Sequence, residues 1–333
     1  MIQRMSRVVT VALCVVLSGC KGGGAGQPDL AGTGDMATGP VNKVDILFMM
    51  DNSLSTSAFR NELSKRFPQL IKALDGAASS GHPASYHFGV VTSDLGAGTN
   101  TSACRAGGDG GKLQVGPSPA ISNVPAACSS FTLGGGVRFL DYDQLAGSNN
   151  IGGGLDLPTA FNCMAAVGDL GCGFEHVLES VYVALHDPIP ENAGFLRPDA
   201  LLVVVFATDE DDCSAPADSD FFEPSTDHYG PLHSFRCTQY GVTCGSVPRP
   251  LTDADAAGPL SDCRPLSMAD GGKLFDVQRY IDFFTLPAAM GGVKVNPANV
   301  MLAGIMPPAA PFAIRDTAPC GDVANQSSCL ILS

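Results

Sequence analysis

The sequence predicts an α/β fold in which a mostly parallel sheet is covered by helices on both faces. Short, almost continuous apolar runs alternate along the chain with segments of helical periodicity. Such a run is typical of a strand buried on both faces, and a strand–helix–strand order predicts right-handed crossovers between parallel strands. The 333 residues leave room for one large domain or two small ones.

The first expected strand is 44–50, which reads VDILFMM. A helix is expected at 55–74, because apolar residues recur there on one helical stripe. Pro68 is expected to kink or divide this helix, since proline lacks the N–H that an interior helical position donates. A second strand is predicted at 87–92.

The middle of the chain, residues 94–169, is rich in glycine and shows little periodicity, and an edge strand is expected near 137–140. An amphipathic helix at 175–185 then leads into 200–207. This last segment reads ALLVVVFA and is the strongest strand candidate in the chain.

A cysteine-bearing insertion is expected from 213 to about 272, followed by a helix at 273–285 and a last clear strand at 299–305. The remaining residues, 307–333, are proline-rich and are expected to form a disulfide-tied tail.

The N-terminus has the pattern of a secretory signal. Arg4 and Arg7 precede an apolar stretch at 8–17, which is too short to span a bilayer. The stretch ends in Leu-Ser-Gly-Cys, which resembles the bacterial lipobox, so residues 1–19 are expected to be a lipoprotein signal peptide and Cys20 the lipidated residue. The alternative is an ordinary secretory peptide with an incidental cysteine. Residues 20–42 are expected to contain the lipidated cysteine and a flexible, glycine-rich linker.

Ten cysteines remain after Cys14 and Cys20 are set aside, which predicts five disulfides and an oxidising compartment. Spacing does not determine the pairing, but proximity in the sequence favours a set of five bonds: Cys104–Cys128, Cys163–Cys172, Cys213–Cys263, Cys237–Cys244 and Cys320–Cys329. A zinc site at His228, His233 and Cys237 is a weaker alternative, because no paired CxxC spacing occurs.

Charge and motifs exclude several classes of function. The formal net charge of −14 and the pI near 4.6 argue against nucleic-acid binding and against docking to a membrane through basic residues. No HExxH or GxSxG motif occurs, and the glycine-rich stretch near residue 110 lacks the glycine and Ser/Thr of a phosphate loop. Because no nucleophile–base pair is recognisable, an enzyme is not expected.

Oxygen-bearing side chains follow two of the predicted strands. Asp51, Ser53 and Ser55 form a DxSxS motif after the first strand, and Asp209 follows the strongest one. Ligands gather at the carboxyl ends of parallel strands, and hard divalent cations such as Mg²⁺ prefer oxygen ligands. The alternative for the two serines is capping of the following helix. Asp211 and Asp212 are expected to be solvated loop charges, with a calcium site in the insertion as the alternative.

These features together resemble the von Willebrand factor A domain with its metal-ion-dependent adhesion site. The lipobox and the sequences DNSxS, GVVTSDLG, GCGFEHVLE and TDEDDCS are more narrowly similar to cysteine-rich lipoproteins of this family from myxobacteria and related bacteria. The resemblance implies a Rossmann-like domain at 43–306 with insertions at about 95–170 and 213–272.

In that family the motif residues hold a divalent cation, which implies Asp51, Ser53, Ser55 and Asp209 as metal ligands here, with Mg²⁺ favoured over Ca²⁺ or Mn²⁺. The family's threonine is absent from the expected place at 171–175, where Glu175 is a possible substitute. Thr92 is a further candidate.

The resemblance implies a lipid-anchored cell-envelope protein, at the outer membrane rather than the inner one and either periplasmic or surface-exposed. A carboxylate from a protein or glycan partner would complete the shell of the cation. The alternative is a structural envelope scaffold with a degenerate, metal-free site.

Overall fold

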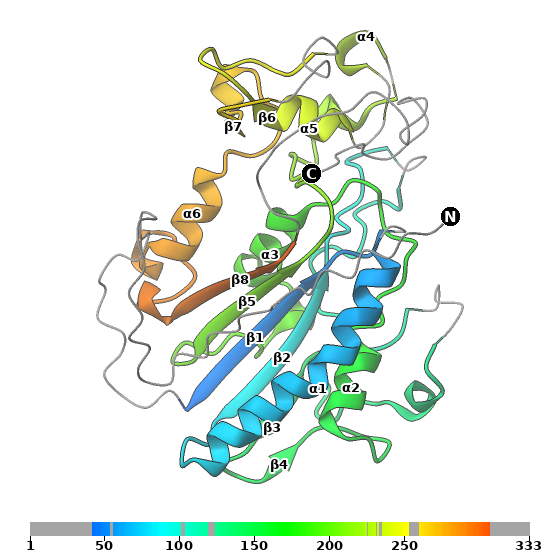
Figure 1. Cartoon of the computed structure of the whole chain (residues 1–333), viewed down its shortest axis with the longest axis vertical. Helices are drawn as coiled ribbons and strands as arrows, with labels where there is room; N and C mark the ends of the chain where they lie inside the picture. The colour runs from blue at the N-terminus through cyan, green and yellow to red at the C-terminus, as the bar shows by residue number, and fades with distance from the viewer. Residues whose placement is uncertain are drawn as a thin grey trace.

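The computed structural model describes residues 42–53, 56–100, 104–118, 124–224, 226–230, 232, 235–252 and 260–306. Its centre is a six-stranded sheet in the order β4-β3-β2-β1-β5-β8 (Figure 1). The predicted α/β class, with a mostly parallel sheet between layers of helices, is confirmed. Within these ranges no helix is both long and apolar enough to cross a membrane.

Four parallel strands form the body of the sheet, with β1 (Lys43–Met50) between β2 (Ser85–Thr92) and β5 (Leu201–Ala207), and β8 (Val300–Ile305) beyond β5. The other edge is antiparallel and consists of β3 (Leu140–Asp143) and β4 (Ser148–Asn149). The four predicted long strands are therefore confirmed to within about two residues. The edge strand lies three residues later than expected.

The apolar residues of β1 alternate between the two faces of the sheet. Phe48 and Met50 belong to a core with α1 (Ser57–Ser79) and α2 (Leu157–Met164). Leu47 and Met49 belong to a second core with α3 (Val177–His186) and α6 (Gln278–Thr285). Both faces of the strand are buried, which explains its almost continuous apolar sequence.

Helix α1 runs through Pro68 without being divided, and it ends five residues later than the sequence predicts. Phe67 and Ile71 flank the proline and are buried in the core of the sheet. Burial of this apolar face of α1 stabilises the helix and compensates for the backbone hydrogen bond that Pro68 cannot donate.

The insertions form a third apolar cluster that joins residues from both of them. It contains buried aromatic residues, including Phe174, Phe221 and Phe222, together with Cys172, Cys213 and Cys237. The short elements of the insertions are η1 (Ala126–Ser130), η3 (Asp220–Phe222), α4 (Thr226–Tyr229), α5 (Phe235–Gly241), β6 (Val242–Thr243), β7 (Arg264–Pro265) and η5 (Met268–Asp270). Three further short helices precede β5 or β8: η2 (Pro190–Asn192), η6 (Ala288–Met290) and η7 (Pro297–Asn299).

Four disulfides join cysteines of the described residues, and the pairing predicted from sequence proximity is wrong for all eight of these cysteines. The bonds are Cys104–Cys172, Cys128–Cys163, Cys213–Cys237 and Cys244–Cys263. Elements distant in the sequence pack side by side, so proximity along the chain does not decide the pairing. Cys320 and Cys329 lie outside the described residues, as does Cys20.

Cys237 cannot supply a thiolate ligand to the alternative zinc site, because its sulfur is bonded to Cys213. His233 lies outside the described residues.

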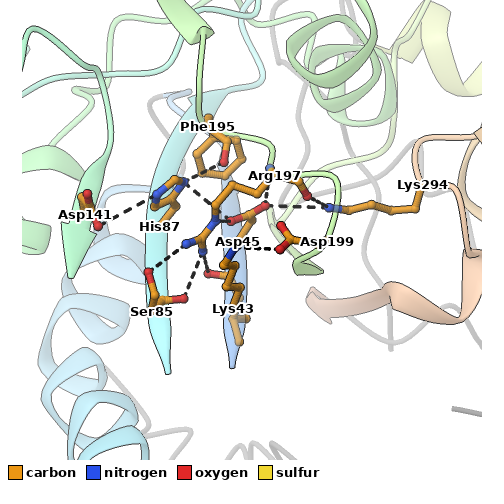
Figure 2. Close-up of polar contacts among 10 residues, drawn as sticks. Lys43, Asp45, Ser85, His87, Asp141, Phe195, Arg197, Asp199 and Lys294 are labelled. Carbon is orange, nitrogen blue, oxygen red and sulfur yellow. Dashed lines mark hydrogen bonds and ion pairs between the residues drawn. The ribbon is translucent and has the colours of Figure 1, made fainter. Parts of the chain in front are cut away.

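A buried ionic network lies at the amino end of the sheet (Figure 2). Asp45 on β1 is fully buried and accepts hydrogen bonds from Nε and the backbone N–H of Arg197, each at 2.7 Å. Nζ of Lys294 donates to the carbonyl of Arg197 at 2.5 Å and lies 3.8 Å from the Asp45 carboxylate. Through these contacts Arg197 binds the loop before β5, and Lys294 the loop before β8, to the central strand β1.

Candidate functional site

The carboxyl ends of β1, β2, β5 and β8 meet at one edge of the sheet, where the strand order reverses around β1 (Figure 1). The chain segments that leave the strands are joined by backbone hydrogen bonds. The N–H of Asp51 donates to the carbonyl of Ala207 at 3.0 Å, and the N–H of Ser93 donates to Met50 at 3.3 Å. The carboxyl edge of an open α/β sheet is where ligands usually bind.

Asp51 links the turns that follow β1 and β5. Its side chain is 1% exposed. Oδ1 accepts the N–H of Ser53 at 2.8 Å, and Oδ2 accepts the hydroxyl of Thr208 at 2.7 Å. The two turns predicted to meet are therefore adjacent, although more than 150 residues separate them in the sequence.

Ser53 is buried beside Asp51, whereas Ser55 lies outside the described residues. Thr56 occupies the N-cap position of α1, and its hydroxyl donates to the carbonyls of Ser53 and Asp51 at 2.8 and 3.1 Å. Thr56, and not Ser53, is therefore the N-cap residue of α1.

Asp209 directly follows Thr208 and is exposed at the surface of the same turn. The next residue, Glu210, is partly buried, and its N–H donates to the hydroxyl of Thr208 at 3.1 Å. The turn after β5 thus presents one exposed and one partly buried carboxylate next to Asp51.

The loop before α3 brings Glu175 to this edge. The N–H of Gly171 donates to the carbonyl of Asn52 at 3.0 Å, and the carbonyl of Glu175 accepts the N–H of Cys213 at 2.7 Å. A Cβ on Gly171 would lie 2.3 Å from Oδ1 of Asn52, so a larger residue at position 171 would force the buried Asn52 amide or the loop itself to shift. The loop before α3 therefore abuts the turn after β1.

Glu175 is 1% exposed and lies among other carboxyl groups. Loss of hydration raises its pKa well above the ordinary value, and the nearby Glu210 and Asp51 raise it further. The Oε1 atom of Glu175 has no hydrogen-bond partner among the described residues. Glu175 is therefore stable at this position either as the neutral, protonated acid or as a carboxylate paired with a cation.

Unpartnered buried polar atoms gather in the segments that form this edge. Seven such side-chain atoms occur in the described part of the chain, and four of them belong to Asn52, Ser93, Glu175 and His176. The backbone N–H of His176 donates to the carbonyl of Ser93 at 2.9 Å, which places their segments in contact. Buried oxygen atoms without partners suit a hard cation, which prefers oxygen ligands.

His, Cys, Asp and Glu side chains alone do not form a metal cluster here: no group of three or more of them is arranged to hold an ion within the described ranges. A DxSxS site also draws on serine hydroxyls, and Ser55 is outside those ranges.

Thr92 is buried, but its hydroxyl donates to Oδ2 of Asp109 at 2.6 Å. Asp109 also forms an ion pair with Arg105. Thr92 thus holds the glycine-rich turn beside β2, and no hydrogen bond links its side chain to Asp51 within the described structure.

Asp211 and Asp212 differ from the solvated loop charges that the sequence suggests. Oδ1 of Asp212 accepts the N–H of Leu178 at 2.9 Å and the hydroxyl of Ser214 at 2.6 Å. Burial raises the pKa of Asp212 to about 6. Oδ2 of Asp211 accepts the hydroxyl of Thr238 at 2.8 Å. Asp212 therefore caps α3 from a distant segment.

Sequence reasoning missed the contributions of Thr208, Glu210 and Ser93 to this edge. All three directly follow or nearly follow a predicted strand, which is the signal that could have singled them out.

The chain matches no protein-family model, no curated protein and no solved structure.

Proposed function

We propose that this chain is a lipid-anchored cell-envelope protein that binds a protein or glycan partner through a divalent cation at the edge formed by Asp51, Asp209 and Glu175. The observation that carries the proposal is the buried Asp51 carboxylate, which joins the turns after β1 and β5 beside a second buried carboxylate with an unpartnered oxygen. The von Willebrand A-like adhesion site is the family interpretation of this arrangement.

Asp51, Ser53, Ser55 and Asp209 are the residues that would hold the cation, with Glu175 in place of the family's threonine. A bound Mg²⁺, Ca²⁺ or Mn²⁺ would offer a site of positive charge to an oxygen atom of the partner. The protein's own contribution is to bury Asp51 and Glu175 and to keep Asp209 at the surface, where a partner can approach.

The proposed location rests on the N-terminal signal and on the disulfides. Four disulfides favour an oxidising compartment. The lipidated residue would be Cys20, and the linker at 20–42 would let the folded part move away from the membrane surface.

Calorimetric titration of the full chain with Mg²⁺, Ca²⁺ and Mn²⁺ tests the proposal. Wild type is expected to bind at least one of these cations, and Asp51→Ala is expected to bind it at least tenfold more weakly. The matched control is Asp199→Ala, because Asp199 is an exposed aspartate at the other end of the sheet. Absence of binding by wild type, or equal binding by Asp51→Ala, would contradict the proposal.

A metal-free scaffold is the second candidate. It is favoured by the hydrogen bonds to Asp51, because both of its oxygens accept a donor from the chain itself. Capture of an envelope partner that persists undiminished in EDTA would support this candidate.

A further inference from the structure

The four disulfides of the described residues differ in burial. Three of them contain cysteines that are at most 6% exposed, namely Cys128, Cys163, Cys172, Cys213 and Cys237. In the fourth, Cys244–Cys263, both residues are partly exposed. A disulfide breaks when an external thiolate reaches one of its sulfur atoms, so access favours exchange at the fourth bond.

Cys244 and Cys263 close a small hairpin that lies outside the central sheet (Figure 1). Strands β6 and β7 pair over only two residues each. Asp262 precedes Cys263 and has a φ of 52°, in the left-handed region that favours glycine. Within the described ranges it is the only non-glycine residue with a positive φ. The bond therefore lies beside a strained residue and a short ladder, which is a setting typical of labile disulfides.

The residues that flank the hairpin are anchored without the disulfide. Thr243 is 1% exposed and Leu266 is 3% exposed. The N–H of Leu266 donates to the carbonyl of Gly241 at 2.8 Å, and the N–H of the buried Leu251 donates to Gln239 at 2.9 Å. The hairpin therefore stays attached to α5 when the bond opens, and reduction is a local event.

Arg264 holds the two sides of the bond together. Its Nη1 atom donates to the carbonyl of Gly245 at 2.7 Å and to that of Asp262 at 3.3 Å. Gly245 follows Cys244, and Asp262 precedes Cys263. The two thiols of the reduced chain therefore remain neighbours, and the bond can re-form in an intramolecular step.

We infer that Cys244–Cys263 is a thiol–disulfide exchange site whose substrate is an external dithiol, whereas the other three disulfides are structural. One thiolate of the dithiol attacks a sulfur of the bond, the S–S bond breaks, and the electron pair leaves on the other cysteine, which takes up a proton. The second thiol of the dithiol, as its thiolate, then attacks the mixed disulfide, becomes part of a disulfide within the reagent, and releases the remaining cysteine.

The exchange transfers two electrons and two protons to the chain and oxidises the dithiol. The mixed disulfide of the first step is a covalent link, so a protein that carries the dithiol is joined to the chain at this hairpin until the second step. This exchange needs no cation and is independent of the proposed cation site.

Graded reduction of the full chain in detergent tests the inference. Dithiothreitol is the probe, free thiols are alkylated with iodoacetamide, and mass spectrometry of the peptides locates them. Cys244 and Cys263 are expected to be labelled at least tenfold faster than the six other cysteines in described disulfides, while the circular dichroism spectrum stays native. In concentrated urea, where burial is lost, all eight are expected to be labelled at similar rates.

The matched variant carries both Cys244→Ser and Cys263→Ser. It is expected to keep the native spectrum and to lose the rapidly labelled pair. After removal of dithiothreitol, oxidised glutathione is expected to restore the bond in wild type. Three results would overturn the inference: another described disulfide that is reduced as fast, labelling of Cys244 and Cys263 only when the native spectrum is lost, or a reduced bond that does not re-form.

Discussion

Asp45 and Asp51 lie six residues apart at opposite ends of β1, and both are buried. Asp45 is paired with the charged groups of Arg197 and Lys294. Asp51 instead accepts hydrogen bonds from a hydroxyl and an amide N–H. The cationic groups beside Asp45 compensate the charge of its buried carboxylate.

Replacing Asp45 by Asn tests the structural role of the amino-end network (Figure 2). We expect a loss of about 3–5 kcal/mol in the free energy of unfolding, because the cationic groups of Arg197 and Lys294 would remain buried without a counter-charge. Urea denaturation measures this loss. Asp199→Asn is the control, since its ion pair with Lys43 is exposed to solvent and should contribute little to stability. Equal effects of the two variants would contradict the assignment.

His87 in the same network predicts a pH dependence of stability. Burial lowers its pKa below the ordinary value of 6.5, and Arg197 lowers it further, although the Phe195 carbonyl, Asp45 and Asp141 act in the opposite direction. Below pH 6.5 the unfolded chain takes up a proton at this residue that the folded chain resists, so the stability from this group is lost as the pH falls.

The substitution His87→Phe retains a ring between Phe139 and Phe195 and removes the titrating group. We expect a smaller drop in unfolding free energy between pH 7.5 and 5 than in wild type. The comparison also needs His82→Asn, a change at an exposed histidine, which should keep the wild-type drop. An unchanged drop in His87→Phe would show that His87 does not contribute.

At the scale of elements, the loop before α3 decides the composition of the candidate site. Gly171 is pressed against Asn52, while a Cβ on Gly173 would meet nothing within 4 Å. The two glycines are therefore a matched pair, since the same change creates a clash at one and none at the other.

Gly171→Ala is expected to weaken cation binding at least tenfold, because the added methyl group pushes the Glu175 loop away from the turn after β1. The overpacking should also lower stability by about 1–3 kcal/mol. Gly173→Ala is expected to bind the cation as wild type does. Calorimetry and thermal unfolding of both variants measure these effects. Equal cation affinities of Gly171→Ala and Gly173→Ala would show that the loop before α3 is not part of the cation site.

Elements differ in how well the sequence predicts them. The strands at β1, β2, β5 and β8 were predictable, because burial on both faces leaves a local apolar run. Helix α2 was missed, since its eight residues lie in a glycine-rich segment with weak periodicity. Strand β3 was placed three residues early, because its position depends on antiparallel pairing with β2, which is not a local property.

At the scale of the whole molecule, the sheet brings together residues from segments far apart in the sequence. The sequence could predict Asp51 and Asp209 from their places after strands, because the carboxyl ends of parallel strands share an edge. It could not predict the disulfide pairing or the contact of Glu175 with Glu210, since both depend on how the insertions pack over that edge.

The central claim is that the turns after β1 and β5 and the loop with Glu175 together form one cation site. Anomalous diffraction from a crystal soaked in Mn²⁺ tests this claim most directly. The account predicts an anomalous peak within about 2.0–2.6 Å of oxygen atoms of both Asp51 and Glu175. A fully soaked crystal with no peak at this edge, or with its strongest peak at another place on the molecule, would contradict it.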